Sequence, residues 1–400
     1  MKRLFGILKT VFLLCGAVIG AGFLGGAELA EFFGAAGYAP FLALSGALFF
    51  IGFFVVFLRE KRKSELPVSE KEESLTVKAF FAAELIFSSA MLAGVNEIFL
   101  EAGAGVLSYV LTFALFTISC FCVKKGKLGA EILSASVMPI ALVAVNIFLV
   151  IFLAKTREVN VLESGGHVAR KVREFFGAAS ATGGAGIIGI TSITDGVTAV
   201  TAKAEQSFSV WRGILKAVLF SSLNVFITAP AVTETVKNKS VSGLTVAAAI
   251  FSVIVSAEAF LILRTIERAG TAGAGEPIVR ALAGQGKVVR AVIFTSLFLA
   301  TFTSFFTCFA AVSEGAERAL PKLGKKTKSS SFKTVLFIFV YLFSLAGLNK
   351  IIKFVYPIFG ALGVFYIVNS VIKLVKADGK KRDFLKNDKI ARYKNTAKSR

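Results

Sequence analysis

The sequence predicts an all-α integral membrane protein with ten transmembrane helices. Of its 400 residues 55% are hydrophobic, and the mean hydropathy is +0.74. A soluble domain of this size could not cover so much apolar surface. The apolar runs are about 20 residues long and alternate with charged loops, and this is the length that crosses a bilayer as a helix. Both the composition and the spacing therefore indicate a polytopic membrane domain.

We expect the helices to fall into two repeats of five. The first repeat covers about 4–153 and the second about 208–376, with a long outer loop at about 154–207 between them. Residues 1–376 then form a single transmembrane domain, and 377–400 form a basic cytoplasmic tail that we expect to be disordered. The predicted spans are 4–33, 38–58, 76–98, 104–123, 129–153, 208–231, 242–263, 289–313, 333–350 and 353–376.

The net charge of +21 is explained by membrane orientation better than by a nucleic-acid partner, because the positive residues gather in alternate loops. An even number of spans places all of these clusters, and both termini, in the cytoplasm of a cell-membrane protein. Residues 183–202, which contain Asp195, are interpreted as an outer-loop helix, since an eleventh span would move the basic tail outside. The run after Met1-Lys2-Arg3 is too long for a signal peptide, so we expect the first span to be retained.

No enzyme motif is found, and we expect a protein that is not an enzyme and has no cofactor beyond a possible Na⁺. There is no phosphate-binding loop, no metal-ligand cluster and no nucleophile motif in a suitable context. The single histidine, His167, is expected in a loop. The cysteines Cys15, Cys120, Cys122 and Cys308 all fall inside predicted spans, where small packing residues are expected rather than disulfides or a zinc site.

The first predicted span is unusual because its residues 16–33 contain five glycines and two carboxylates. Glycine weakens a helix by roughly 1 kcal/mol relative to alanine, and a carboxylate in hydrocarbon is more costly still. The span is also 30 residues long, which exceeds what one straight crossing needs. We therefore expect two half-helices joined by an unwound segment near Gly20–Gly26 whose backbone groups can hold a ligand.

A second interruption is predicted five helices later, at residues 221–230. Pro230 removes a backbone donor, and Asn224 and Thr228 can satisfy the groups that a break sets free. Matched interruptions in spans one and six are typical of transporters built from inverted repeats.

The ends of a broken helix suit ligands of opposite charge. A new amino end favours an anionic group, and a new carboxyl end presents bare carbonyls to a cation. Thr303 and Ser304 in the eighth span are candidate hydroxyl ligands for sodium; the alternative is that they bond to carbonyls of their own helix.

Four of the carboxylates within predicted spans are candidates for a functional role. Glu28 can bind a substrate amine, carry a proton or cap the second half-helix, and Glu31 is expected nearer the outer vestibule. Glu84 and Glu258 are candidates for buried partners or proton relays.

The stretch Gly20-Ala21-Gly22-Phe23-Leu24-Gly25-Gly26-Ala27-Glu28-Leu29, followed by Phe32-Phe33, resembles the first-helix signature of the YkvI-like membrane proteins. These are grouped with the amino acid–polyamine–organocation superfamily and its LeuT-type fold. Residues 345–352 and 356–360 resemble that family's last two helices, and Asn224 also fits. The resemblance implies a ten-helix inverted repeat with broken helices 1 and 6, and a central site between helices one, three, six and eight. It also implies a sodium site formed by Thr303, Ser304 and carbonyls near Ile19 and Gly22. Leu24-Gly25 departs from the expected small polar pair.

We therefore expect a secondary active transporter, coupled to Na⁺ or H⁺, that moves a small organic solute such as an amino acid by alternating access. The alternative is a non-transporting membrane receptor of the same fold that senses a ligand; a passive channel fits matched broken helices less well. The expected partners are the solute and the lipid bilayer. The expected substrate-site residues are Gly20, Ala21, Gly22, Phe23, Gly25, Glu28, Asn224 and Thr228, and the expected Na⁺ ligands are Ile19, Gly22, Thr303 and Ser304.

Overall fold

All regular structure in the described part of the chain is helical. The computed structural model describes residues 2–34, 38–62, 70–123, 127–156, 210–230, 236, 239–272, 274, 276–282, 286–319 and 329–398. A helix at Val210–Pro230 lies between α7 and α10 in the sequence. The other helices are α1 (Lys2–Val18), α2 (Ala21–Leu24), α3 (Ala27–Phe33), α4 (Ala39–Lys61), α5 (Glu70–Glu101), α6 (Leu107–Val123), α7 (Lys127–Lys155), α10 (Val241–Ala269), α11 (Pro277–Leu282), α12 (Lys287–Ala319), α13 (Ser329–Ser344), α14 (Leu348–Phe354) and α15 (Tyr356–Lys398).

The chain is a multi-pass membrane protein. Within the described residues, seven helices are long and apolar enough to cross a bilayer, and α13 with α14 forms a bent pair that passes the same test together. Two shorter apolar helices, Leu4–Val18 and Leu107–Cys120, occupy the places of the first and fourth predicted spans. Each predicted span therefore has a helix at its position, and the count of ten crossings stays a prediction.

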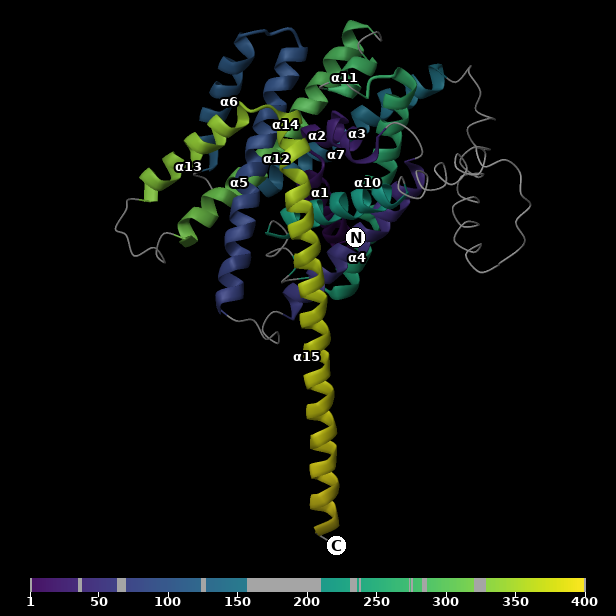
Figure 1. The fold of residues 1–400 in the computed structure, drawn as a ribbon, viewed down its shortest axis with the longest axis vertical. Coiled ribbons are helices and arrows are strands. Elements are labelled where there is room, and N and C mark those ends of the chain that lie inside the picture. Colours follow the sequence, from purple (N-terminus) through teal and green to yellow (C-terminus); the bar gives the residue numbers. More distant parts are fainter. Residues whose placement is uncertain are drawn as a thin grey trace, which may run out of the picture.

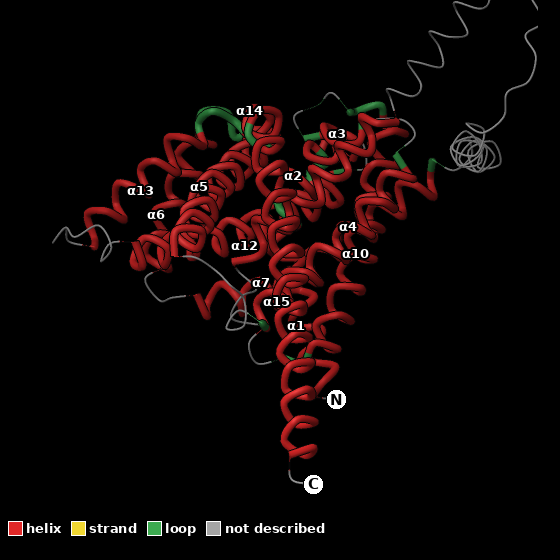
Figure 2. Tube along the Cα trace, turned by 60° about the horizontal axis from the view of Figure 1, so that its bottom comes forward, coloured by secondary structure: helices red, strands yellow, loops and turns green. Residues whose placement is uncertain are grey.

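The helices pack into one bundle with both chain ends directed away from the short helices. In both views α2, α3 and α14 lie together at one end of the bundle, and the N and C termini point toward the other end (Figures 1 and 2). Within the bundle α12 packs against α5 and α7, and α10 packs against α4 and α1. Cys15, Cys120 and Cys308 are free thiols. The outer loop 157–207, with His167 and residues 183–202, lies outside the described residues.

The predicted interruption of the first span is present. α1 ends at Val18, the short helix α2 follows, and α3 begins at Ala27. Gly26, at the N-cap of α3, has a φ of 84°, in the left-handed region that favours glycine. An added Cβ at Gly26 would also lie 2.5 Å from Cδ1 of Ile266. The backbone conformation therefore favours glycine at this joint, and any side chain here would also displace the end of the Ile266 side chain.

The predicted break inside the sixth span is wrong. In the described residues the helix Val210–Pro230 runs without interruption through Asn224 and Thr228. Asn224 does not satisfy backbone groups freed by a break. Its Nδ2 donates to the carbonyl of Phe220 in the same intact helix, at 2.9 Å. Pro230 is the last residue of this helix that the structure describes. The residues that follow, 231–235, lie outside the described part.

The ninth span is shorter than predicted. It was expected to run to 350, but α13 ends at Ser344 and the chain bends by 94° before α14. Gly347 has a φ of 87° and forms the N-cap of α14. The Glu97 carboxylate accepts a hydrogen bond from the amide of Leu348 at 2.9 Å. A glycine in the left-handed region and an acceptor from α5 therefore fix this corner.

The C-terminal tail is helical, contrary to the expected disorder. α15 continues through Lys398 and extends well beyond the other helices (Figure 1). Lysine, arginine, alanine and leucine are good helix formers, and no proline follows Pro357. A helix already nucleated in the bundle can therefore extend through a polar sequence.

Candidate functional site

The hydroxyl of Ser304 on α12 lies at the carboxyl end of α1. It is within 2.8 Å of the Gly16 carbonyl and 3.2 Å of the Ile19 carbonyl, and within 3.1 Å of the Ala300 carbonyl on its own helix. Since α1 ends at Val18, these carbonyls belong to the last turn and to the first unwound residue. Ser304 therefore connects α12 to the point where the first span unwinds.

The other predicted ion ligands are placed differently. The Thr303 hydroxyl donates to the Ala300 carbonyl at 2.8 Å, on its own helix. Gly22 lies beside Glu28, and among the described residues no hydrogen bond joins it to Ser304. Ser304 and the Ile19 carbonyl are therefore together. The Gly16 carbonyl, which the sequence reasoning did not name, completes the group.

The Glu28 carboxylate faces the helix Val210–Pro230. The side chain is 1% exposed, and its Oε1 accepts a hydrogen bond from Asn224 Nδ2 at 3.4 Å. A Cβ added at Gly22 would lie 3.3 Å from Glu28 Oε2, so a glycine here leaves room for the carboxylate. Glu28 is in the first turn of α3, where a negative charge is favoured by the helix dipole. The carboxylate thus bonds across to another helix while it stabilises its own.

Two further buried polar groups belong to this region, one a helical turn from Asn224 and one in electrostatic range of Glu28. Thr228, one turn after Asn224, and Tyr356 at the start of α15 are each 1% exposed. Their hydroxyl oxygens have no hydrogen-bond partner among the described residues. Tyr356 is in electrostatic range of Glu28, and its ring stacks on Phe87 with centroids 5.9 Å apart. The sequence reasoning missed Tyr356 as a site residue; a phenol at the start of an apolar span was the available signal.

Aromatic rings border the polar group. Phe23 is fully buried and stacks on Phe220, with centroids 6.3 Å apart and an interplanar angle of 23°. Phe32 and Phe33 also contact Phe220, at 5.4 and 5.1 Å. Phe220 stands one helical turn before Asn224, so the apolar and polar surfaces adjoin.

Two other glycines of the predicted substrate site, Gly20 and Gly25, are in close contact with other parts of the protein. A Cβ at Gly20 would collide with the sulfur of Met91 and would lie 3.6 Å from Ser304 Cβ. The Gly25 carbonyl accepts a hydrogen bond from the amide of Ile278 in α11 at 3.0 Å, so it is engaged by protein. Ala21 lies in α2.

Close helix packing places Asn224. Ser222 Oγ lies 2.9 Å from the carbonyl of Gly360 in α15. A Cβ at Gly363 would collide with the backbone carbonyl of Ser222. Small residues allow helix backbones to approach in this way within membranes. The two glycines therefore hold α15 directly against the helix that carries Asn224.

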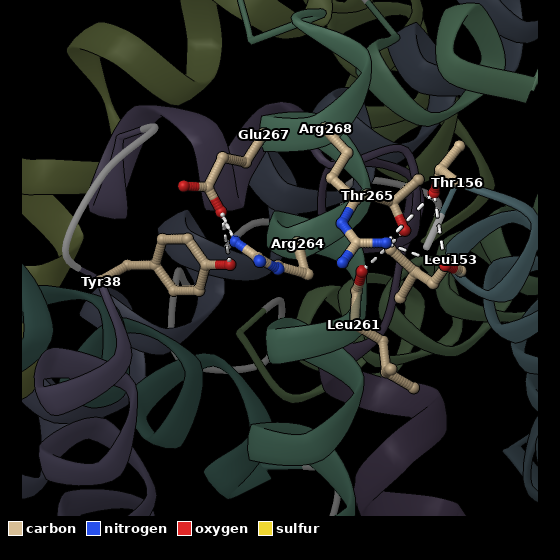
Figure 3. A network of polar contacts seen from close by, with 8 residues as sticks. All are labelled: Tyr38, Leu153, Thr156, Leu261, Arg264, Thr265, Glu267 and Arg268. Carbon is tan, nitrogen blue, oxygen red and sulfur yellow. Dashed lines mark hydrogen bonds and ion pairs between the residues drawn. The ribbon is translucent and has the colours of Figure 1, made fainter. Parts of the chain in front are cut away.

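The carboxyl end of α10 is tied to its neighbours by a polar network (Figure 3). Arg264 forms an ion pair with Glu267 at 2.7 Å, and the Tyr38 hydroxyl donates to the same carboxylate oxygen at 3.3 Å. Arg268 donates to the Leu153 carbonyl and to the Thr156 hydroxyl, at 2.8 and 3.2 Å. These contacts fix α10 to α4 and α7.

The other acids predicted within spans lie on different helices and have different neighbours. Glu258 on α10 accepts a hydrogen bond from Asn146 on α7. Glu84 on α5 is close to Cys308 on α12. Glu31 is exposed, and its carbonyl accepts a hydrogen bond from Lys216.

Comparisons with known proteins place the chain in no family. No family model matches it, and no curated protein matches it. Its shape is similar to the structure of Mhp1, a nucleobase-cation-symport-1 family transporter, in a closed conformation with bromovinylhydantoin bound. The TM-score is 0.46 and the identity 14%, over 89% of this chain and 74% of that one. The resemblance to YkvI-like proteins stays a prediction.

Proposed function

We propose that this protein is a secondary active transporter, not an enzyme, which moves a small organic solute by alternating access, driven by Na⁺ or H⁺. The observation that carries the proposal is the interrupted first span. At the end of α1, backbone carbonyls accept hydrogen bonds from the Ser304 hydroxyl. At the start of α3, Glu28 accepts a hydrogen bond from Asn224. A membrane helix built only as an anchor has no need for either arrangement.

The ion side of the break combines carbonyl and hydroxyl oxygens. The end of α1 has negative partial charge from its helix dipole, and the Gly16 and Ile19 carbonyls point to the Ser304 hydroxyl. Such oxygens are suitable ligands for a hard cation. Thr303 would join if its hydroxyl left the Ala300 carbonyl. Gly22, which the resemblance includes, would need a change of the unwound segment.

The substrate side combines a carboxylate, an amide and two hydroxyls beside aromatic rings. Glu28 and Asn224 would bind a polar substrate group, with Thr228 opposite and Phe23 as an apolar wall. Gly20, Ala21, Gly22 and Gly25 would supply backbone contacts. An amino acid or a related amine matches this mixture, since its ammonium group can meet Glu28. By the distribution of basic loops, both termini would be cytoplasmic.

Reconstituted protein tests the proposal. Proteoliposomes are loaded with buffer, and uptake of labelled standard amino acids is measured with an inward Na⁺ gradient, an inward H⁺ gradient, or neither. Gradient-dependent uptake that Ser304→Ala reduces about tenfold or more is expected, because the ion loses a ligand. Ser296→Ala is the matched control: it is a buried serine on the same helix for which the described residues show no hydrogen bond to α1.

Two results would speak against transport. Uptake that is independent of both gradients would contradict coupling. Binding seen as a rise in melting temperature without any flux would favour the ligand-sensing receptor.

A further inference from the structure

Glu258 is a buried acid that the proposed substrate site does not use. It lies on α10 and is 3% exposed. Asn146 of α7 donates to its Oε2, while its Oε1 is buried and has no hydrogen-bond partner among the described residues. Glu258 is therefore held by one neutral donor inside the membrane domain.

The surroundings of Glu258 contain little that could balance a negative charge. The helices packed against α10 are α1, α3, α4, α7 and α11. From α1 the titratable group in electrostatic range is the Cys15 thiol, and from α7 the neutral Asn146 faces it. In the described parts of α3, α4 and α11 no charged group comes into that range.

The nearest cations along α10 have other partners. Arg264 pairs with Glu267, and Arg268 is bonded to the end of α7 (Figure 3). They follow Glu258 by more than one helical turn and are held at the end of the helix. Glu258 therefore does not gain a countercharge from its own helix.

An ionised carboxylate in an apolar interior needs a countercharge or several donors. Asn146 supplies one donor to Glu258, because its amide nitrogen also donates to the Leu142 carbonyl at 2.9 Å. The arrangement fits the neutral acid, which needs only one donor to its carbonyl oxygen. Loss of the proton would leave a charge that water or a change in packing must stabilise. An acid in this position is suited to bind and release a proton.

Glu258 lies close to the end of α1, where the first span is interrupted. Cys15, which faces it, belongs to the last turn of α1, and the Cys15 carbonyl accepts the amide of Ile19 at 2.7 Å. Ile19 is the residue whose carbonyl meets Ser304. A change in packing around Glu258 would therefore act on the last turn of α1, and this turn carries the carbonyls that contact Ser304.

We propose that Glu258 binds the coupling proton and that its charge state sets the packing of the last turn of α1 against α7 and α10. The step is a proton transfer alone: the carboxylic O–H bond breaks, the proton passes to water, and the carboxylate keeps the electron pair. The inference rests on the proposed transport function and identifies its driving ion. Glu28 is less suited to this role, because a proton there would compete with substrate.

The first experiment needs no substrate. Full-length protein in lipid nanodiscs is titrated from mildly acidic to mildly alkaline pH, and infrared difference spectra record the carbonyl stretch of protonated carboxylic acids. We expect buried-acid bands that decline as pH rises, and Glu258→Gln should lose the component that Glu258 contributes while the components of the other buried acids remain. Asn146→Leu should move the midpoint of the Glu258 component to higher pH, since the carboxylate loses its donor. A full titrating band in Glu258→Gln, or an acid that stays protonated throughout, would overturn the proposal. Glu28→Gln is the matched control and should keep the Glu258 band.

The second experiment measures coupling. Proteoliposomes containing a pH-sensitive dye receive a mixture of the standard amino acids outside, with no Na⁺ present. Wild type should acidify the lumen as it takes up substrate. Glu258→Gln should exchange labelled amino acids between equal pools without acidification or accumulation. Glu258→Asp, which keeps a carboxyl group, should restore acidification with a shifted pH profile.

The outcomes separate the two proposals. Accumulation and acidification by Glu258→Gln at the wild-type level would overturn the role of Glu258 and leave transport intact. If wild type neither exchanges nor accumulates, either here or with an inward Na⁺ gradient, the transport function fails, while the infrared titration still decides whether Glu258 binds a proton. If Glu258→Gln does not fold, an unshifted pH profile in Glu258→Asp would contradict the inference.

Discussion

Two buried acid–amide pairs in this bundle have similar chemistry and different surroundings. Glu28 accepts from Asn224 at 3.4 Å beside the unwound part of the first span and is in electrostatic range of Tyr356, and Thr228 lies one helical turn beyond Asn224. Glu258 accepts from Asn146 and faces the thiol of Cys15. The first pair adjoins polar groups that have no bonding partner among the described residues, whereas the second is bordered by packed helices.

The difference indicates two kinds of task. A carboxylate with unpaired hydroxyls around it can exchange its protein partner for a polar ligand, because the ligand satisfies groups that are already desolvated. A carboxylate with one donor and apolar neighbours can gain or lose only something as small as a proton or a water molecule. On this reasoning we propose a substrate contact at Glu28 and a proton site at Glu258, although the residue types are the same.

The largest expected effect comes from a packing change that disturbs the Glu28–Asn224 pair and leaves the Glu258–Asn146 pair intact. Gly363→Ala would push a methyl group into the Ser222 carbonyl and displace the helix that carries Asn224. We expect a loss of about 1–3 kcal/mol in the free energy of unfolding, together with loss of ligand binding, while the infrared band of Glu258 stays. Gly6→Ala is the control, since nothing lies within 4 Å of a Cβ there. Denaturant unfolding in detergent measures the stability; a Gly363→Ala protein as stable as Gly6→Ala would contradict the packing.

The next effect concerns the substrate contact alone. Glu28→Gln keeps the shape and removes the charge, so a bound ammonium group would lose a charge-assisted hydrogen bond of about 1.5–3 kcal/mol. We expect amino acid binding to weaken about 10- to 100-fold. The measurement is the concentration dependence of the melting temperature for amino acids that stabilise wild type. Equal affinities for wild type and Glu28→Gln would remove Glu28 from the site; Glu258→Gln should bind as wild type does.

The sequence predicted one of these regions well. Five glycines and two carboxylates in an apolar span violate the requirements of a simple membrane helix, and the break occurs where they gather. Ser304 was also named as a candidate ligand, because a bare helix end favours oxygen ligands, and the resemblance to the YkvI-like proteins implied its pairing with the Ile19 carbonyl. Unusual residues in a membrane span are informative because each one has an energetic cost.

Other features depended on contacts between distant helices. Asn224 and Pro230 suggested a break, yet the asparagine bonds to the Phe220 carbonyl of its own helix, and all described residues from Val210 to Pro230 are helical. The pairing of Asn146 with Glu258 joins residues that are far apart in the sequence, so no local pattern indicates it. The corner before α14 needed both Gly347 and the carboxylate of Glu97.

The next prediction compares the loss of stability when each of the two amide donors, Asn146 and Asn224, is removed. Asn146→Ala removes the hydrogen-bond donor to Glu258, and we expect a cost of about 1–3 kcal/mol for the buried acid left without it. Asn224→Ala removes a longer bond of 3.4 Å, so its cost should lie at the lower end of that range. Thermal unfolding at mildly acidic pH measures both. A larger loss in Asn224→Ala than in Asn146→Ala would reverse the assignment of the tighter pair.

A third buried acid, without an amide, gives the smallest expected effect. Glu276 precedes α11 and is 1% exposed, and neither carboxylate oxygen has a hydrogen-bond partner among the described residues. Burial raises its pKa well above the ordinary value, and the negative charges of Glu97 and Glu101 raise it further. Two residues later the Ile278 amide bonds to the Gly25 carbonyl in the break. The protonation of Glu276 is therefore linked to the packing of α11 on the first span.

Because the pKa of Glu276 is higher in the folded than in the unfolded protein, the folded form binds this proton more tightly. Its contribution to stability is complete below the unfolded pKa of about 4.3, and it is lost as pH rises through the raised folded value. Hydrogen exchange at the Ile278 amide, corrected for the intrinsic effect of pH, should therefore show protection that declines toward alkaline pH. Glu276→Gln should make this protection independent of pH. Glu101→Gln removes one repelling charge and should move the decline to lower pH by a smaller amount, so an unchanged midpoint there would show that the charge of Glu101 does not raise the pKa of Glu276.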